Sequence, residues 1–388
     1  YMRSHKEKNQ TRFYAMFAIA IASTMGTAFA GNMFTLFLFY EVLTLSTYPL
    51  VAHTGTEEAK RGARTYLGIL LGTSIGLQLL AIMITYSLTG TLDFREGGIV
   101  AEHLDPAWAG VLYALFIFGI GKAAVMPFHR WLPAAMVAPT PVSALLHAVA
   151  VVKAGVFTVL KVTVYIFGTD FIVSSSASDW LIWFAAATIL LASLVAMNQD
   201  NLKRRLAYST VSQLSYIVLG ALLATESSII GGALHITMHA FAKITLFFAA
   251  GAILVAAHKT EVSQLNGLGR QMPLTFLFFT IGACSIIGLP PFGGMWSKWY
   301  LAMGTIEAGQ YMLLGVLMLS SLLNIVYLLA IPARAFFSKA TSADNHFHGE
   351  APWTCLVAMS LSSLMCIVLF FNPEPFYSLA RMLVTQAP

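Results

Sequence analysis

Eleven long apolar runs, separated by short polar breaks, are the feature that most constrains this chain. A membrane-spanning helix needs about 20 mostly apolar residues. Only 10% of the residues are charged, whereas a soluble domain carries about 25%. The sequence therefore predicts an all-α, polytopic membrane protein with about eleven transmembrane helices, at residues 13–30, 33–52, 65–89, 108–128, 141–167, 180–197, 205–224, 229–257, 274–300, 310–334 and 353–371.

The loop lysines and arginines predict how the helices are oriented. One side of the predicted membrane has only Arg95 and Arg381. Because loops rich in Lys and Arg stay in the cytoplasm, we expect the N-terminus inside and the C-terminus outside a bacterial inner (cell) membrane. The other fifteen loop residues lie on the predicted cytoplasmic side: Arg3, Lys6, Lys8, Arg12, Lys60, Arg61, Arg64, Arg130, Lys203, Arg204, Arg205, Lys259, Arg270, Arg334 and Lys339.

The fourth and ninth predicted helices contain their own breaks, at Pro127 and at Pro290–Pro291. Proline removes a backbone donor, and in lipid such a break persists only where protein or water satisfies the freed groups. These helices lie five spans apart, so a second five-helix unit would enter from the opposite face. We therefore predict two inverted repeats, 1–170 and 171–340, followed by a C-terminal helix in 341–388. Two unrelated proline kinks are the alternative.

Ionisable side chains inside a membrane are costly, at roughly 2.5–3.5 kcal/mol each, and they mark function. Glu41 and Lys122 are predicted to pair, with opening and closing of the pair setting the proton affinity of the lysine; a fixed structural ion pair is the alternative. Lys153 lies mid-helix, far from both ends. Since burial favours its neutral form, Lys153 could take and release a proton. Lys161 is nearer a helix end and could reach the membrane surface.

Histidines accompany these lysines. His147 precedes Lys153 by six residues, about 120° around an α-helix, so both could line one wide cavity. On the eighth helix, residues four apart share one face and could relay protons, while packed core histidines or a metal site are alternatives: His235, His239 and Lys243. Lys298 follows the second break and is a candidate terminal proton carrier on the exit side, or a lysine that reaches the membrane surface.

Other functional classes find little support. The chain has no phosphate-binding loop, nucleophile elbow or dinucleotide fingerprint in a soluble context, and its three cysteines have no CxxC spacing. The basic residues are scattered, which does not suit nucleic-acid binding. We therefore predict no cofactor, no metal site and no redox or catalytic site of its own.

Four stretches, in this order, resemble signatures of one family: GKAAVMPFHRWLPAAMVAPTPVSALLHAVAVVKAGVF, LKRRLAYSTVSQLSYI, LHITMHAFAKITLFF and GLPPFGGMWSK. The chain is similar to the antiporter-like membrane subunits shared by respiratory complex I (NADH-quinone oxidoreductase), Mrp-type sodium/proton antiporters and energy-converting hydrogenases. The resemblance covers nearly the whole chain. Members usually carry about three additional helices before these repeats, so we expect a fragment of a longer protein.

The resemblance implies two inverted five-helix repeats, each holding a half-channel. It also assigns proton-carrying roles to a Glu–Lys pair, a central lysine with a histidine beside it, two connecting histidines and a terminal lysine: Glu41, Lys122, Lys153, His147, His235, His239 and Lys298. The expected function is proton translocation within a larger complex I-like or Mrp-like assembly, with other membrane subunits and the lipid bilayer as partners. The alternatives are a sodium/proton antiporter subunit of an Mrp system, or a non-transporting anchor of a hydrogenase or inorganic-carbon uptake complex. The charges within the helices argue against an anchor.

Overall fold

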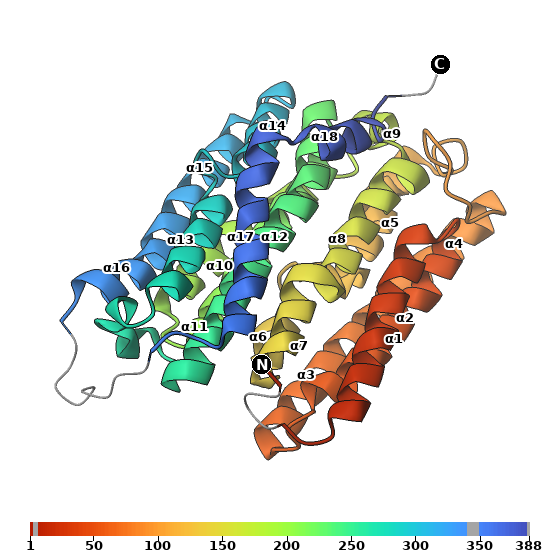
Figure 1. Cartoon of the computed structure of the whole chain (residues 1–388). Coiled ribbons are helices and arrows are strands. Elements are labelled where there is room, and N and C mark those ends of the chain that lie inside the picture. The colour runs from red at the N-terminus through yellow and green to blue at the C-terminus, as the bar shows by residue number, and fades with distance from the viewer. Residues whose placement is uncertain (3–6, 340–348, 386–388) are drawn as a thin grey trace.

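The protein is a bundle of long helices that run side by side, with the N-terminus toward one end and the last described helix, α18 (Glu374–Arg381), at the other (Figure 1). The computed structural model describes residues 1–2, 7–339 and 349–385. In this part of the chain there is no β-strand, only two isolated β-bridges. Nine helices of the described residues are long and apolar enough to cross a membrane, and two shorter apolar helices accompany them, α5 (Pro106–Gly119) and α13 (Pro273–Ile287). The all-α polytopic prediction is confirmed.

The first half of the bundle contains two regular spans and three that are interrupted or irregular. The regular spans are α1 (Gln10–Phe29) and α2 (Met33–Val51). The remaining elements are α3 (Glu57–Thr73), η1 (Ser74–Gln78), α4 (Leu79–Thr89), α5 (Pro106–Gly119), η2 (Gly121–Ala123), α6 (Trp131–Ala134), η3 (Ala135–Val137), α7 (Thr140–Ala144), η4 (Leu145–Val149), α8 (Val151–Val162) and η5 (Thr163–Phe167).

The second half follows a short connecting helix, α9 (Thr169–Ser175). Its elements are α10 (Leu181–Asn198), α11 (Leu202–Leu223), α12 (Glu226–Ala257), η6 (Val262–Leu265), η7 (Leu268–Arg270), α13 (Pro273–Ile287), α14 (Gly294–Glu307), α15 (Tyr311–Asn324), η8 (Ile325–Leu329) and α16 (Ala330–Phe337). The chain continues with α17 (Trp353–Phe371) and α18 (Glu374–Arg381), and α18 lies across one end of the bundle (Figure 1).

The third span begins earlier than the apolar pattern predicts, at Glu57 instead of residue 65. The Thr56 hydroxyl accepts a hydrogen bond from the backbone N–H of Ala59 (3.1 Å) and so caps the helix. Glu57 and Glu58 in the first turn complement the positive end of the helix dipole. Apolar length marks only the part of a helix suited to lipid, and this capped, charged turn extends beyond it.

The fourth and ninth spans are discontinuous, as the sequence predicts. α5 ends at Gly119, so the helix expected over 108–128 is shorter, and α13 ends at Ile287 within the expected 274–300. Protein groups satisfy parts of the freed backbone. The indole of Trp131 donates to the Gly121 carbonyl (2.9 Å), and the Gly293 N–H donates to the Cys366 carbonyl (2.7 Å).

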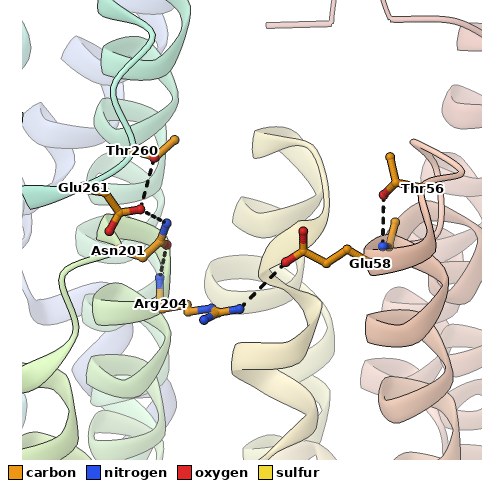
Figure 2. A network of polar contacts seen from close by, with 7 residues as sticks. Thr56, Glu58, Asn201, Arg204, Thr260 and Glu261 are labelled. Atoms are coloured by element: carbon orange, nitrogen blue, oxygen red, sulfur yellow. Dashed lines mark hydrogen bonds and ion pairs between the residues drawn. The ribbon is translucent and has the colours of Figure 1, made fainter.

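Two junctions in the two halves are built alike. Asn32 caps α2 by accepting from Thr35 N (2.8 Å) and forms a β-bridge with Asp93. Asn201 caps α11 by accepting from Arg204 N (3.1 Å) and forms a β-bridge with Glu261. Figure 2 shows the second junction, where the Asn201 side chain also donates to the Glu261 carboxylate (3.0 Å).

The two junctions lie at opposite ends of the bundle. Asn32 stands at the start of α2, whereas Glu58 stands at the start of α3, beyond the other end of α2. The Arg204 guanidinium reaches the Glu58 carboxylate at 4.0 Å, which places the second junction at the Glu58 end (Figure 2). The predicted limit between the second repeat and the C-terminal helix, at residues 340–341, lies outside the described residues, as do Arg3 and Lys6.

Candidate functional site

A direct contact between two buried basic side chains joins the first half of the bundle to the second. Lys153 on α8 is only 6% exposed, and its Nζ lies 2.7 Å from Nδ1 of His239 on α12. α12 is the 32-residue helix at the centre of the molecule, and its Thr225 cap fixes its start. Since both groups can bind and release a proton, the contact is a point where a proton could pass between halves.

The line of polar groups continues along α12. The His239 and His235 rings lie one turn apart, with centroids separated by 5.7 Å. Nδ1 of His235 lies 2.8 Å from the Ser297 hydroxyl on α14, and its ring stacks on Tyr216 of α11 at 5.8 Å. The predicted helical spacing therefore places both histidines in one buried line.

Lys298 is the last ionisable group of this line and lies next to the break in the second broken helix. Its Nζ donates to the carbonyl of Ile287 (3.1 Å), the last residue of α13, and to the Ser321 hydroxyl of α15 (2.9 Å). The ammonium also lies 4.9 Å from the centre of the Tyr216 ring. The lysine thus satisfies a carbonyl freed by the break, while its side chain reaches the same tyrosine that stacks on His235.

Lys122 occupies the corresponding break in the first half. It lies in η2 and is fully buried. Its Nζ donates to the Tyr40 carbonyl (2.7 Å) and the Thr44 hydroxyl (2.6 Å), and its backbone N–H donates to the Tyr40 hydroxyl (3.2 Å). The ammonium sits 3.1 Å from the centre of the Tyr40 ring. The surroundings therefore stabilise a cation without a direct carboxylate contact.

Glu41 lies next to this site on α2, but not in the ion pair that the sequence predicts. Within the described residues, neither carboxylate oxygen of Glu41 has a hydrogen-bond partner, although both are buried. No Glu41–Lys122 approach within 4.0 Å occurs among the described ion pairs. The opening and closing of this pair stays a prediction.

Close backbone packing sets Lys122 beside α8. A Cβ added at Gly155 would overlap the Lys122 carbonyl carbon and would lie 2.5 Å from Ala123 N. Only glycine permits this approach, and Gly155 stands two residues after Lys153. The first broken helix is therefore adjacent to the helix that carries the central lysine, although no side-chain contact joins Lys122 to Lys153 among the described hydrogen bonds.

His147 and Lys243 lie on the same central helices but outside the continuous line. His147 is in the π-helical turn η4, and its ring packs on Phe247 at 4.7 Å. Both of its ring nitrogens are buried without a hydrogen-bond partner in the described part of the chain. Lys243 donates to the Leu206 carbonyl on α11 (3.1 Å). These side chains remain candidates for a branch of the line.

Sequence reasoning missed the neutral groups that hold the ionisable ones. Tyr216, Ser297 and Ser321 connect His235 to Lys298, and Tyr40 with Thr44 surrounds Lys122. A signal for Tyr216 was present, since YSTVSQLSY places several polar side chains within one span. Among the residues that the structure describes, no three His, Cys, Asp or Glu side chains group as metal ligands would.

Comparisons with known proteins agree with the fold and with the family suggested by the motifs. Residues 30–324 match the family described as NADH:quinone oxidoreductase/Mrp antiporter, TM. An NADH-quinone oxidoreductase subunit of Desulforudis audaxviator is 36% identical, over 96% of this chain and 77% of that protein. A Na(+)/H(+) antiporter subunit of Alkalihalophilus pseudofirmus is 27% identical, over 98% of this chain and 76% of that protein.

A solved structure, the Mrp complex from Dietzia sp. DQ12-45-1b, has the same fold. One of its chains matches with a TM-score of 0.85 at 24% identity, covering 95% of this chain and 76% of that chain. The chain spans less than half the length of the NAD(P)H-quinone oxidoreductase chain 5 proteins that it also matches.

Proposed function

Because the chain belongs to the NADH:quinone oxidoreductase/Mrp antiporter transmembrane family, we propose that it is a proton-translocating, antiporter-like membrane subunit of a larger assembly. The relatives named above are themselves subunits, of a quinone oxidoreductase and of an antiporter. The partners are then other membrane subunits and the surrounding lipid. Redox chemistry in such an assembly belongs to those partners.

One observation carries this proposal: the 2.7 Å contact between Lys153 and His239. It joins α8 to α12 in the interior, and it continues through His235 toward Lys298. Glu41, Lys122, His147 and Lys243 complete the proposed set of proton-carrying groups. A scaffold would not need this many ionisable groups in a membrane interior, because each one lowers the stability of the inserted helices.

The two halves are proposed to be inverted repeats, each with its own half-channel. One line of support is the pair of matched asparagine junctions at opposite ends of the bundle. A second is that α5 and α13 both begin with a proline and both end next to a glycine. A lysine lies at each break, the buried Lys122 in the first half and the partly buried Lys298 on α14 in the second. This arrangement suits a site at mid-membrane.

Protons, rather than sodium ions, are proposed to move along the line. Its members are lysine and histidine nitrogens, which bind protons, whereas hard metal cations prefer several oxygen ligands. The end of the bundle with Lys60, Arg204 and Lys259 is proposed to face the cytoplasm of a bacterium, because positive loops stay inside. Proton uptake should accordingly persist when sodium is replaced by choline.

The test is proton movement by the Lys153→Ala variant in membrane vesicles that contain the whole assembly, followed with a pH-sensitive dye. We expect normal assembly and loss of proton-coupled activity, because the central carrier is gone. Lys60→Ala is the matched control, since Lys60 is an exposed lysine paired with Glu57 (2.8 Å). Full activity of Lys153→Ala would contradict the proposed function.

A further inference from the structure

Lys161 is the one lysine within the predicted spans that does not belong to the proposed set of proton-carrying groups. It borders an apolar groove between the two halves. The groove encloses about 320 Å³ and lies between α1, α8, α12 and α18. Its walls are apolar or aromatic apart from Lys161 and Thr237, and they include Phe157, Ile236 and Leu379. In a protein embedded in lipid, such a groove suits a hydrocarbon chain.

The Lys161 ammonium is held at one edge of this groove. It donates to the Ala30 carbonyl at the end of α1 (2.8 Å) and lies 4.2 Å from the centre of the Phe94 ring. An ammonium has three donors, so one carbonyl leaves donor capacity toward the groove. Among the described residues, no carboxylate lies within 4.0 Å of Lys161. A phosphate would supply the missing counter-charge.

A second, polar cavity of about 140 Å³ adjoins the groove and shares Tyr165 and Leu383 with it. Glu96 and Asp170 line this cavity, both are exposed, and neither forms an ion pair among the described residues. The apolar groove is thus bordered by a cation, and the cavity next to it is bordered by two carboxylates. These charges are complementary to a phosphate that carries an ammonium.

We propose that this groove binds a phospholipid whose headgroup carries a primary ammonium, as in phosphatidylethanolamine. An acyl chain occupies the apolar groove, the phosphate contacts Lys161, and the ammonium lies toward Glu96 and Asp170. The amphipathic helix α18, which lies across this end of the bundle, covers part of the bound acyl chain. The lipid thereby packs between α8 and α12 at the surface of the bundle. In the interior, the same two helices are joined by the contact between Lys153 and His239.

The test is native mass spectrometry of the delipidated assembly with added phosphatidylethanolamine, phosphatidylcholine or phosphatidylglycerol of identical acyl chains. We expect phosphatidylethanolamine to be retained best. Lys161→Gln should weaken retention of every one of these phospholipids about tenfold, the loss expected for a charge-assisted phosphate contact. The double variant Glu96→Gln/Asp170→Asn should remove only the preference for phosphatidylethanolamine over phosphatidylcholine. Lys60→Gln, with the same charge change at the other end of the bundle, should retain all three as the original chain does.

A second pair of variants leaves the lysine in place, because Lys161 also caps α1 and its removal could alter that helix. Ala28→Trp would fill the groove from α1, whereas Ala22→Trp places the same ring on an exposed position outside it. Only Ala28→Trp should lower lipid retention. Equal retention of all three lipids, stronger retention of phosphatidylglycerol, or no effect of Lys161→Gln and Ala28→Trp would overturn the proposal.

Discussion

Lys122 and Lys298 stand at the two broken helices and have the same three kinds of neighbour. Each ammonium donates to one backbone carbonyl and to one hydroxyl, and each faces a tyrosine ring: Tyr40, Thr44 and the Tyr40 carbonyl for Lys122, and Tyr216, Ser321 and the Ile287 carbonyl for Lys298. The two halves thus hold their lysines in equivalent neutral surroundings.

The difference between the two sites is Glu41. This carboxylate lies beside the Lys122 site, and no acidic residue lies in the corresponding helix α11. The helices that supply Tyr216 and Ser321 to the second site carry a hydroxyl cluster instead, in which Ser212 and Ser320 hydrogen bond to each other and to Ser193 at 3.0–3.4 Å. A nearby acid lets the charge of one lysine respond to another group. We propose from this comparison that the first half sets proton affinity through Glu41, whereas the second half has no such acid on the helix that faces its lysine.

We expect the largest effect from replacing Glu41. Glu41→Gln should impair both assembly and proton transport, because it removes the buried carboxylate beside the Lys122 site, and a buried charge that loses its nearby counter-charge costs about 3–5 kcal/mol. The double variant Glu41→Gln/Lys122→Met should assemble better than the single variant but remain inactive. Lys298→Met should assemble normally, since it leaves no buried carboxylate behind. Assembly is read from the yield of intact complex, and equal yields for the single and double variants would show that the two groups are not coupled.

A smaller effect concerns the packing beside the first break. Gly155→Ala should destabilise the protein by about 1–3 kcal/mol, because its Cβ would meet the Lys122 backbone. Gly294→Ala is the second-half counterpart, with a Cβ that would overlap the Ser285 carbonyl oxygen. Gly72→Ala, where nothing lies within 4 Å, is the control. Thermal unfolding of the purified assembly measures all three, and an unchanged midpoint for Gly155→Ala would refute the close packing.

The tyrosine hydroxyls should matter about equally in both halves. Tyr216→Phe removes the hydroxyl that donates to the Leu317 carbonyl (3.1 Å) but keeps the ring beside Lys298. Tyr40→Phe removes the acceptor of the Lys122 N–H and keeps its ring. Each should cost about 1 kcal/mol of stability and leave transport largely intact. Replacing either tyrosine by leucine should lower the transport rate further, and identical rates for Phe and Leu variants would exclude a role for the rings.

The smallest effect is expected for the ion pair between Arg204 and Glu58, which links the two halves. The Arg204–Glu58 pair is exposed and 4.0 Å apart, so solvent and salt screen it. Glu58→Gln should leave the unfolding midpoint unchanged at physiological ionic strength. A clear decrease would mean that this contact, rather than the buried contacts of α8 and α12, holds the halves together.

The sequence was sufficient to predict the broken spans, because proline removes a donor wherever it occurs. It was also sufficient to place His235 and His239 on one face, since α12 is a regular helix there. The angle expected between His147 and Lys153 assumed a regular helix, whereas the π-helical turn η4 at 145–149 changes the register. No feature of the local sequence predicted that π-helical turn.

The sequence pattern could not predict contacts between segments that are far apart in the chain. Lys153 and His239 are 86 residues apart, and only the packing of α8 against α12 joins them. The neutral surroundings of Lys298 are equally non-local, because Tyr216 and Ser321 come from two other helices. Periodicity shows which face of a helix carries a side chain, but not which neighbouring helix that face meets.

The central claim is that Lys153 carries a proton across its contact with His239 rather than serving as a fixed positive charge. Proton transport by the Lys153→Arg variant in vesicles tests it most directly. Arginine keeps the charge but scarcely releases a proton. We predict an intact assembly with no proton-coupled transport, while transport at the original rate would contradict a proton-carrying role for Lys153.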